Sequence, residues 1–136
     1  MILSVKRVLS SSKEQIIAMD NQRIFDLEQM ACFSEQGATV TPVIETENSS
    51  IAIWAVRPQQ IVQPHFHPDG QDTWVMLKGT LTYYLGEHKS QTLTQGEVAI
   101  AEKGQVHGAI NHSQENAVFV SIYSAPQIGY QRELDY

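Results

Sequence analysis

Hydrophobic and polar residues alternate over short distances from Ala38 onward, with the two-residue period of β-strands. Short runs rich in β-branched and aromatic residues are separated by turn residues, which is typical of an all-β sandwich or barrel. The runs that we interpret as strands are 39–44, 51–56, 65–67, 73–78, 80–85, 91–94, 98–101, 106–110 and 117–123.

Some of these runs carry more specific signals. Pro42 has no N–H to donate to a neighbouring strand, so its strand should lie at the edge of a sheet. Ile51 to Val56 is apolar at consecutive positions, which predicts a strand that is covered on both faces. Gly86 to Lys89 separates two runs and predicts a hairpin turn. Pro126 and Gly129 mark the exit from the last strand.

The first third of the chain has a weaker pattern. Ser11 to Glu14 has the spacing of a helix capping box and is followed by apolar residues, which predicts the start of a short helix. Ile24, Leu27 and Ala31 also fit helical spacing, but Arg23 to Leu27 fits an extended conformation equally well. We therefore leave this second segment open.

The composition is that of one globular domain. The chain has 136 residues, of which 42% are hydrophobic and 18% charged. Its net charge of -6 would repel a phosphate backbone, so we expect no nucleic-acid partner. No apolar run is long enough to span a bilayer, so we expect no membrane partner either.

The chain has one cysteine, Cys32, so it cannot form an internal disulfide, which fits a reducing compartment. Cys32 stands between Ala31 and Phe33, and we expect it to be a small buried apolar residue rather than a nucleophile. The N-terminus lacks the apolar run and cleavage pattern of a signal peptide. These features together predict a cytoplasmic protein.

Candidate chemistry is concentrated in the segment 65–72, with the sequence HFHPDGQD. Residues two apart on a strand point to the same face, so His65 and His67 should project side by side. Asp72 starts the next strand after a turn, and His107 offers a third imidazole further along the chain. Three imidazoles and a carboxylate suit one divalent ion such as Fe, Mn, Ni or Zn. Taken alone, the histidine pair fits equally well two histidines that face solvent or form hydrogen bonds in a core.

The positions and spacing of these residues resemble the two signature motifs of the cupin superfamily. In the first motif, a glycine is followed by five residues, His-x-His, three or four residues, Glu, six residues and Gly. In the second, a glycine is followed by five residues, Pro-x-Gly, two residues, His, three residues and Asn. The residues of this chain that match these positions are His65, His67, Gly79, Gly96, Gly104, His107 and Asn111.

Three positions depart from the motifs. Gln59 replaces the opening glycine of the first motif, and Glu102 replaces the proline of the second. Asp72 stands where the first motif has Glu, which shortens the side chain by one methylene group. Asp72 could therefore bind a metal directly, through water or not at all. Gln71 could supply an amide oxygen instead, although strand alternation favours an outward position for it.

The resemblance implies a double-stranded β-helix, or jelly-roll, barrel at roughly 38–126 after an N-terminal extension at 1–37, within a single domain spanning 1–136. It also implies one divalent metal ion held by His65, His67, Asp72 and His107. The RmlC-like cupins have varied activities, so fold alone does not choose a function. We weigh an oxygenase- or isomerase-like enzyme that acts on a small organic molecule against a non-catalytic binding module or sensor for a small molecule or sugar.

The same resemblance suggests a pocket wall and an assembly. Gln71, Trp74, Met76, Tyr83 and Phe119 are candidates for contacts with a substrate, although most of them also suit an ordinary barrel core. No catalytic acid or base is evident from the sequence. Cupins commonly pair through sheet faces, so we expect a homodimer, with Trp54 and Tyr123 as candidates for its surface.

Overall fold

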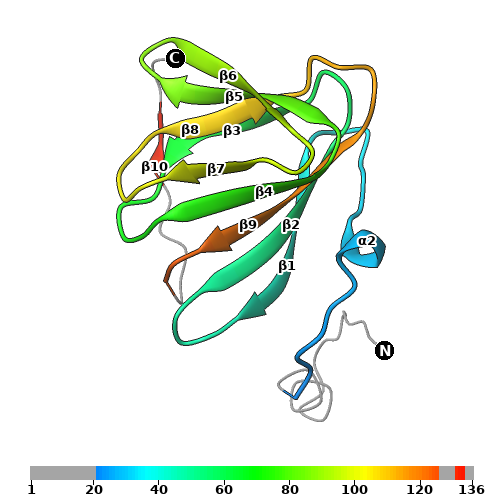
Figure 1. The fold of residues 1–136 in the computed structure, drawn as a ribbon, viewed down its shortest axis with the longest axis vertical. Coiled ribbons are helices and arrows are strands. Elements are labelled where there is room, and N and C mark those ends of the chain that lie inside the picture. Colours follow the sequence, from blue (N-terminus) through cyan, green and yellow to red (C-terminus); the bar gives the residue numbers. More distant parts are fainter. Residues whose placement is uncertain (1–20, 126–130, 134–136) are drawn as a thin grey trace.

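The computed structural model of the protein describes residues 21–125 and 131–133. Figure 1 shows that this part of the chain is built almost wholly from β-strands, with one short helix beside them. The elements are α2 (Leu27–Met30), β1 (Thr39–Glu45), β2 (Ser50–Val56), β3 (Ile61–Phe66), β4 (Asp72–Lys78), β5 (Thr80–Gly86), β6 (Lys89–Thr94), β7 (Val98–Ala101), β8 (His107–Ile110), β9 (Ala117–Tyr123) and β10 (Gln131–Arg132).

The strands form two five-stranded sheets. The first has the order β1-β2-β9-β4-β7 and the second has the order β10-β3-β8-β5-β6. Neighbouring strands within these sheets are antiparallel, which confirms the all-β class and the jelly-roll topology. The two sheets do not close into one continuous barrel, so β1, β7, β10 and β6 remain edge strands.

The main core fills the space between the two sheets. It is built from inward-facing side chains of both sheets, as expected for strands whose residues alternate between a covered and an outer face. Its buried members are Val56, Val62, Trp74, Met76, Leu81, Tyr83, Leu93, Ala109, Ala117 and Phe119.

A second apolar cluster lies on the outer face of the first sheet. Ile53, Val118 and Val120 are its buried members. Leu27 and Met30 of α2 pack against this cluster, so the short helix covers part of the outer face. The first sheet is therefore apolar on both faces.

Most of the predicted strands are confirmed. Pro42 lies on the edge strand β1, as its missing N–H required. Strand β2 has buried residues on both faces, and residues 87 and 88 form the turn between β5 and β6. The predicted capping box at Ser11 to Glu14 and the exit at Pro126 and Gly129 lie outside the described residues.

The segment that the sequence left open is divided by Asp26. It has neither helix nor strand from residue 22 to Asp26, and a one-turn helix begins at Leu27. Asp26 caps this helix, because its Oδ1 accepts a hydrogen bond from the N–H of Gln29 at 3.1 Å. No helix in the described part of the chain has the length and apolar character needed to cross a membrane.

The expected burial of Cys32 is wrong, because its side chain is exposed. The helix ends just before it, and Ala31 turns toward the outer apolar cluster instead. The backbone carbonyl of Cys32 accepts a hydrogen bond from the hydroxyl of Thr39, which ties this loop to the start of β1. Neighbouring apolar residues in the sequence therefore did not indicate the direction of the thiol.

Trp54 and Tyr123 do not form an outer surface. Trp54 lies opposite Phe119 in the β2–β9 ladder and stacks on its ring at 5.8 Å, which places both rings on the inner face. Tyr123 is only 1% exposed. Because side chains alternate along β2, the outward positions belong to Ile51 and Ile53 instead.

Candidate metal centre

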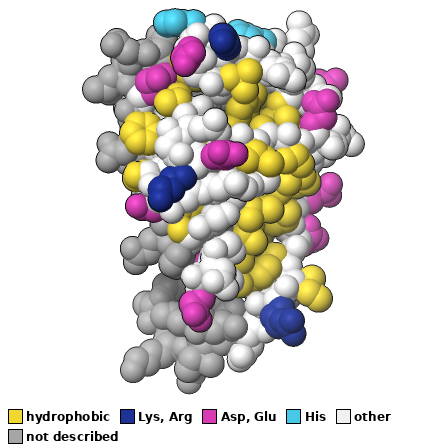
Figure 2. Space-filling model, turned by 60° about the vertical axis from the view of Figure 1, so that its left-hand side comes forward, with side chains coloured by type: hydrophobic (Ala, Val, Ile, Leu, Met, Phe, Trp, Pro, Cys, Tyr) yellow, Lys and Arg dark blue, Asp and Glu magenta, His cyan; other side chains and the backbone are white. Residues whose placement is uncertain are grey.

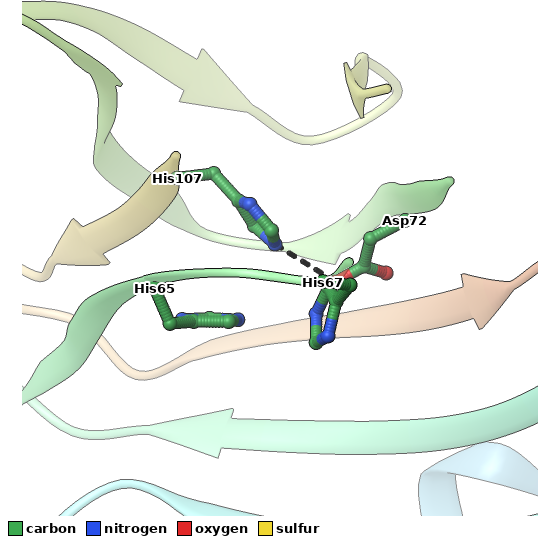
Figure 3. A group of neighbouring side chains, drawn as sticks. All are labelled: His65, His67, Asp72 and His107. Atoms are coloured by element: carbon green, nitrogen blue, oxygen red, sulfur yellow. Dashed lines mark hydrogen bonds and ion pairs between the residues drawn. The ribbon is translucent and has the colours of Figure 1, made fainter. Parts of the chain in front are cut away.

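Three strands bring four buried side chains together at one end of the core. His65 lies on β3, His67 directly after it, Asp72 at the start of β4 and His107 at the start of β8. Their exposed fractions are 4%, 6%, 4% and 1%, and one candidate ligand atom of each lies within 4.8 Å of all the others. Figure 3 shows their side chains converging on one point. The four residues are therefore positioned to bind one metal ion.

The strand register explains why the histidines meet. His65 lies directly opposite His107 in the antiparallel pair of β3 and β8, so the two side chains project from the same face. Their ring centroids are 4.3 Å apart. His67 follows two residues after His65, and its ring is 4.8 Å from that of His65. A backbone hydrogen bond of 2.9 Å from Gly104 N–H to the carbonyl of His67 holds the end of this segment.

Backbone carbonyls orient two of the imidazoles. Nδ1 of His65 lies 2.6 Å from the carbonyl oxygen of Gln63, and Nδ1 of His107 lies 3.0 Å from that of Gln105. Since a carbonyl can only accept, each Nδ1 must carry the hydrogen and donate it. In a neutral ring this leaves Nε2 as the atom with a lone pair, which is the usual arrangement of a metal-binding histidine.

Asp72 is held by donors on both of its oxygens. The hydroxyl of Ser121 donates to Oδ1 at 2.6 Å, and Nε1–H of Trp74 donates to Oδ2 at 3.0 Å. Burial alone would raise the pKa of the Asp72 carboxyl, but hydrogen bonds with His107, His67 and Ser121 outweigh it and hold the pKa well below its ordinary value. Asp72 is therefore a carboxylate whose orientation is fixed.

The contacts around Oδ2 of Asp72 suit a cation. Nε2 of His107 lies 3.0 Å from this oxygen, and Nε2 of His67 lies 3.2 Å from it. A neutral His107 with its hydrogen on Nδ1 would place a lone pair against the negative oxygen, which is unfavourable unless a proton or a metal ion lies between them. The donor set of imidazole nitrogens and a carboxylate oxygen therefore fits a divalent transition metal.

His65 has the protonation state that a metal ligand needs. Burial and the positive charge that His107 can carry lower the pKa of His65 from 6.5 to about 4. The ring is therefore neutral at physiological pH and can donate its Nε2 lone pair. The two remaining histidines of the chain, His88 and His112, are exposed and lie outside this group.

Four of the predicted pocket residues belong to the main core, and two of them also lie against the candidate metal centre. Trp74 and Tyr83 lie against the metal centre, with ring centroids 5.5 Å and 6.4 Å from that of His107. Met76 and Phe119 belong to the main core, where Phe119 stacks on Trp74 at 4.0 Å. That any of the four contacts a substrate remains a prediction.

Gln71 is half-buried, and its amide nitrogen lies 3.3 Å from Oγ1 of Thr73, to which it donates. This bond directs the amide toward a half-buried neighbour two residues along the chain. Asp72, by contrast, lies among the imidazoles, so the shorter side chain still reaches them. The geometry therefore favours Asp72 over Gln71 as the fourth ligand.

Two residues of strand β9 that support the centre were not predicted from the sequence. Ser121 donates to Asp72, and the ring of Tyr123 lies 4.8 Å from that of His67. Both share the inner face of β9 with Phe119. A serine at an inward position between two aromatic residues was the available signal, because a buried hydroxyl requires a partner.

Comparison with known proteins agrees with this geometry. The family model described as the Cupin domain matches residues 52–123, which extend from within β2 to the end of β9. This chain belongs to the cupin domain family. The match contains all four residues of the candidate metal centre and both strands that supply their buried donors.

Similar proteins extend the match to most of the chain. An uncharacterized protein of Aquifex aeolicus (strain VF5) is 30% identical over 112 residues, which cover 80% of this cupin and 89% of that protein. A crystal structure of an uncharacterized conserved protein with a double-stranded β-helix domain, from Klebsiella pneumoniae, is 35% identical. It has a TM-score of 0.79 over 83% of this cupin and 99% of that chain.

The TT1209 protein from Thermus thermophilus is also similar. It is 26% identical, with a TM-score of 0.71 over 77% of this cupin and 100% of that chain. These similarities support the fold over nearly the whole length of the two solved relatives.

Proposed function

We propose that this cupin binds one divalent metal ion through His65, His67, Asp72 and His107 and acts on a small organic molecule as an oxygenase- or isomerase-like enzyme. The convergence of four buried ligand atoms within 4.8 Å carries the proposal. Fe, Mn, Ni and Zn all suit this donor set, so the residues do not choose among them.

The protein residues would supply orientation and a dry environment. A divalent ion held by these residues would polarise a coordinated substrate oxygen. Gln63 and Gln105 orient two imidazoles through their carbonyls, and Ser121 fixes the carboxylate of Asp72. The buried ring of Trp74 both donates to Asp72 and keeps water from the inner side of the centre. These contacts preorganise the ligands, which is the protein's usual contribution to metal catalysis.

One observation favours the alternative, a non-catalytic binding module or sensor for a small molecule or sugar. Tyr83 lies beside His107, but burial and the charge of Asp72 raise the pKa of its phenol above the ordinary value. The phenol therefore stays protonated and can donate a hydrogen bond, but it cannot serve as a general base at neutral pH.

A single experiment separates the two functions. Protein reconstituted with Fe(II), Mn, Ni or Zn is incubated with panels of hydroxy acids, keto acids, sugars and phenols, and NMR records both binding and conversion. The enzyme proposal expects conversion that disappears on chelation and in His107→Ala, while His112→Ala, an exposed histidine outside the centre, behaves as wild type. Binding without conversion by every metal form would support the binding module instead.

We also propose that the cupin is a homodimer that pairs through the outer face of the first sheet. Leu77, Val98 and Ile100 are 39%, 52% and 54% exposed. Val98 lies opposite Val75 in the β4–β7 ladder, so these positions continue the second apolar cluster toward the sheet edge. Figure 2 shows hydrophobic side chains gathered in a band along the visible face of the molecule. Exposed apolar surface of this kind commonly marks an interface.

A further inference from the structure

A cavity of about 360 Å³ lies beside the metal centre. Three of its lining residues touch residues of the centre. Tyr83 stacks near the ring of His107, and Gln105 accepts the Nδ1–H of the same histidine through its carbonyl. Ala101 lies opposite Asp72 in the β4–β7 ladder. The cavity and the centre therefore share a wall.

Glu133 brings a carboxyl group to this cavity from the far end of the chain. Glu133 directly follows β10, which pairs with β3. Its backbone N–H donates to the carbonyl of Pro64 at 3.0 Å. Figure 1 shows β10 at the end of the molecule where β3 and β7 finish. Glu133 lines the cavity together with Tyr83 and Ala101, so a residue outside the match to the family reaches the surroundings of the metal centre.

The carboxyl group of Glu133 has an unsatisfied oxygen. Its Oε2 is buried and has no hydrogen-bond partner within the described residues. A carboxylate oxygen removed from water without a donor is unfavourable, and nearly all buried polar atoms in proteins have a partner. Because Glu133 lines the cavity, a rotation of its carboxyl group would turn this oxygen toward a ligand that supplies the missing donor.

The charged residues on the cavity wall indicate which kind of donor group a ligand would carry. Glu87 is the other charged residue on its described wall, and neither Lys nor Arg lines it there. Two carboxyl groups with no positive partner among the described residues create a negative potential that favours a cation over an anion. A protonated amine combines this positive charge with N–H donors for Glu133.

We propose that Glu133 is a specificity-determining residue that selects ligands carrying a protonated amine beside the metal centre. This inference names the class of small molecule in the proposed function, but the binding that it describes does not require the metal. Leu85 and Val106 give the same cavity apolar surface, so a small amine with a ring or short hydrocarbon chain would match both parts of the wall.

Benzylamine tests this proposal on the full chain after chelation, so that no metal can bind the probe. Ligand-observed NMR compares it with benzyl alcohol and benzoate, which have the same ring but no positive charge. We expect benzylamine to bind and benzoate not to bind. Glu133→Gln, which keeps the size of the side chain, should weaken benzylamine binding by about tenfold or more.

The control variant is Glu87→Gln, because Glu87 lines the same cavity but is exposed. It should change benzylamine binding by less than about threefold, since an exposed charge is screened by water. Glu133→Asp keeps the charge but shortens the side chain by one methylene group. It should bind benzylamine with an affinity between those of the wild type and Glu133→Gln. Thermal unfolding of each variant shows whether it is folded.

Three results would overturn the proposal: no binding of benzylamine to the wild type, equal binding to folded Glu133→Gln, or equal binding of benzoate. The metal content of the wild type is measured separately, and its absence would overturn the proposed metal-dependent function without affecting the amine test. Unchanged metal content in Glu133→Gln is expected, and its loss would assign Glu133 to the metal centre instead.

Discussion

His65 and His107 are oriented by the same kind of local hydrogen bond. Each donates its Nδ1–H to the carbonyl of the residue two positions earlier, Gln63 or Gln105. Because the acceptor belongs to the backbone, a change in the glutamine side chain leaves the bond in place. Asp72 instead depends on a side chain from another strand, the hydroxyl of Ser121. The carboxylate is therefore the ligand whose support can be removed by one mild substitution.

Ser121→Ala should lower metal affinity by about 10- to 100-fold, the usual effect of removing a hydrogen bond from a metal ligand. The substitution removes the donor to Oδ1 of Asp72 and leaves the four ligands intact. Competitive titration with a metal-binding dye measures the affinity. Ser90→Ala on the exposed strand β6 is the control. Equal affinities in the two variants would show that the bond from Ser121 does not matter for metal binding.

The metal-free protein should lose stability as the pH falls from about 6.5 to about 4. Burial and the charge of His107 lower the pKa of His65 to about 4, so the unfolded chain takes up this proton first as the pH falls. The loss from His65 is complete below its folded pKa and amounts to roughly 3 kcal/mol, since each pKa unit corresponds to about 1.4 kcal/mol.

Urea unfolding of chelated protein at a series of pH values measures this effect. His65→Gln cannot take up the proton, so its stability should fall less steeply over the same pH range. Parallel pH profiles for the wild type and His65→Gln would contradict a lowered pKa for His65.

At the scale of the elements, the two-residue period predicted the positions of β1, β2 and β4 to β9, and β7 and β9 have the predicted bounds. Strand β3 differs from the predicted run 65–67, because it begins at Ile61 and ends before His67. The period shows which residues share a face of a strand, but not which of the two faces points into the core. Trp54 was expected on an outer surface, yet its pairing with Phe119 places it inward. Strand β10 is two residues long and has no hydrophobic pattern, so neither it nor Glu133 could be predicted.

The glycine that joins β4 to β5 should tolerate substitution less well than the glycine before β7. Gly79 and Gly96 both have a positive φ, of 80° and 88°. A Cβ on Gly79 would lie 2.6 Å from the backbone oxygen of Asn116, whereas a Cβ on Gly96 would meet nothing within 4 Å. We expect Gly96→Ala to cost about 1 kcal/mol, the penalty of a positive φ alone, and Gly79→Ala to cost clearly more.

Thermal and urea unfolding of the two alanine variants provide this comparison. Each variant is the other's control, because both replace a glycine of positive φ with alanine. Equal losses of stability would mean that the backbone near Asn116 can move aside.

At the scale of the whole molecule, the same sheet serves the metal centre and the proposed interface. The inner face of β4 and β9 supplies Asp72, Trp74 and Ser121, while the outer face carries the second apolar cluster.

The sequence predicted the four candidate ligands because the family motifs fix their spacing. It could not predict the register of β3 on β8 that brings His65 opposite His107, since that pairing depends on contacts distant in sequence.

The proposed homodimer predicts a mass in solution of twice 15.3 kDa. Ile100→Glu places a charge in the proposed interface and should give monomers with unchanged metal content, because burying an unpaired charge is strongly unfavourable. Ser90→Glu on the exposed strand β6 should remain dimeric. Light scattering after size-exclusion chromatography measures the masses, and a monomeric wild type would refute this interface.

The metal content of untagged purified protein tests the central claim most directly. Elemental analysis compares the wild type with a His65→Ala/His107→Ala variant and with a control, His88→Ala/His112→Ala, whose histidines are exposed. We predict about one metal ion per chain in the wild type and the control, and none in the variant without His65 and His107. A wild type that holds no metal after reconstitution with Fe, Mn, Ni and Zn, or a ligand variant that keeps its metal, would contradict the account.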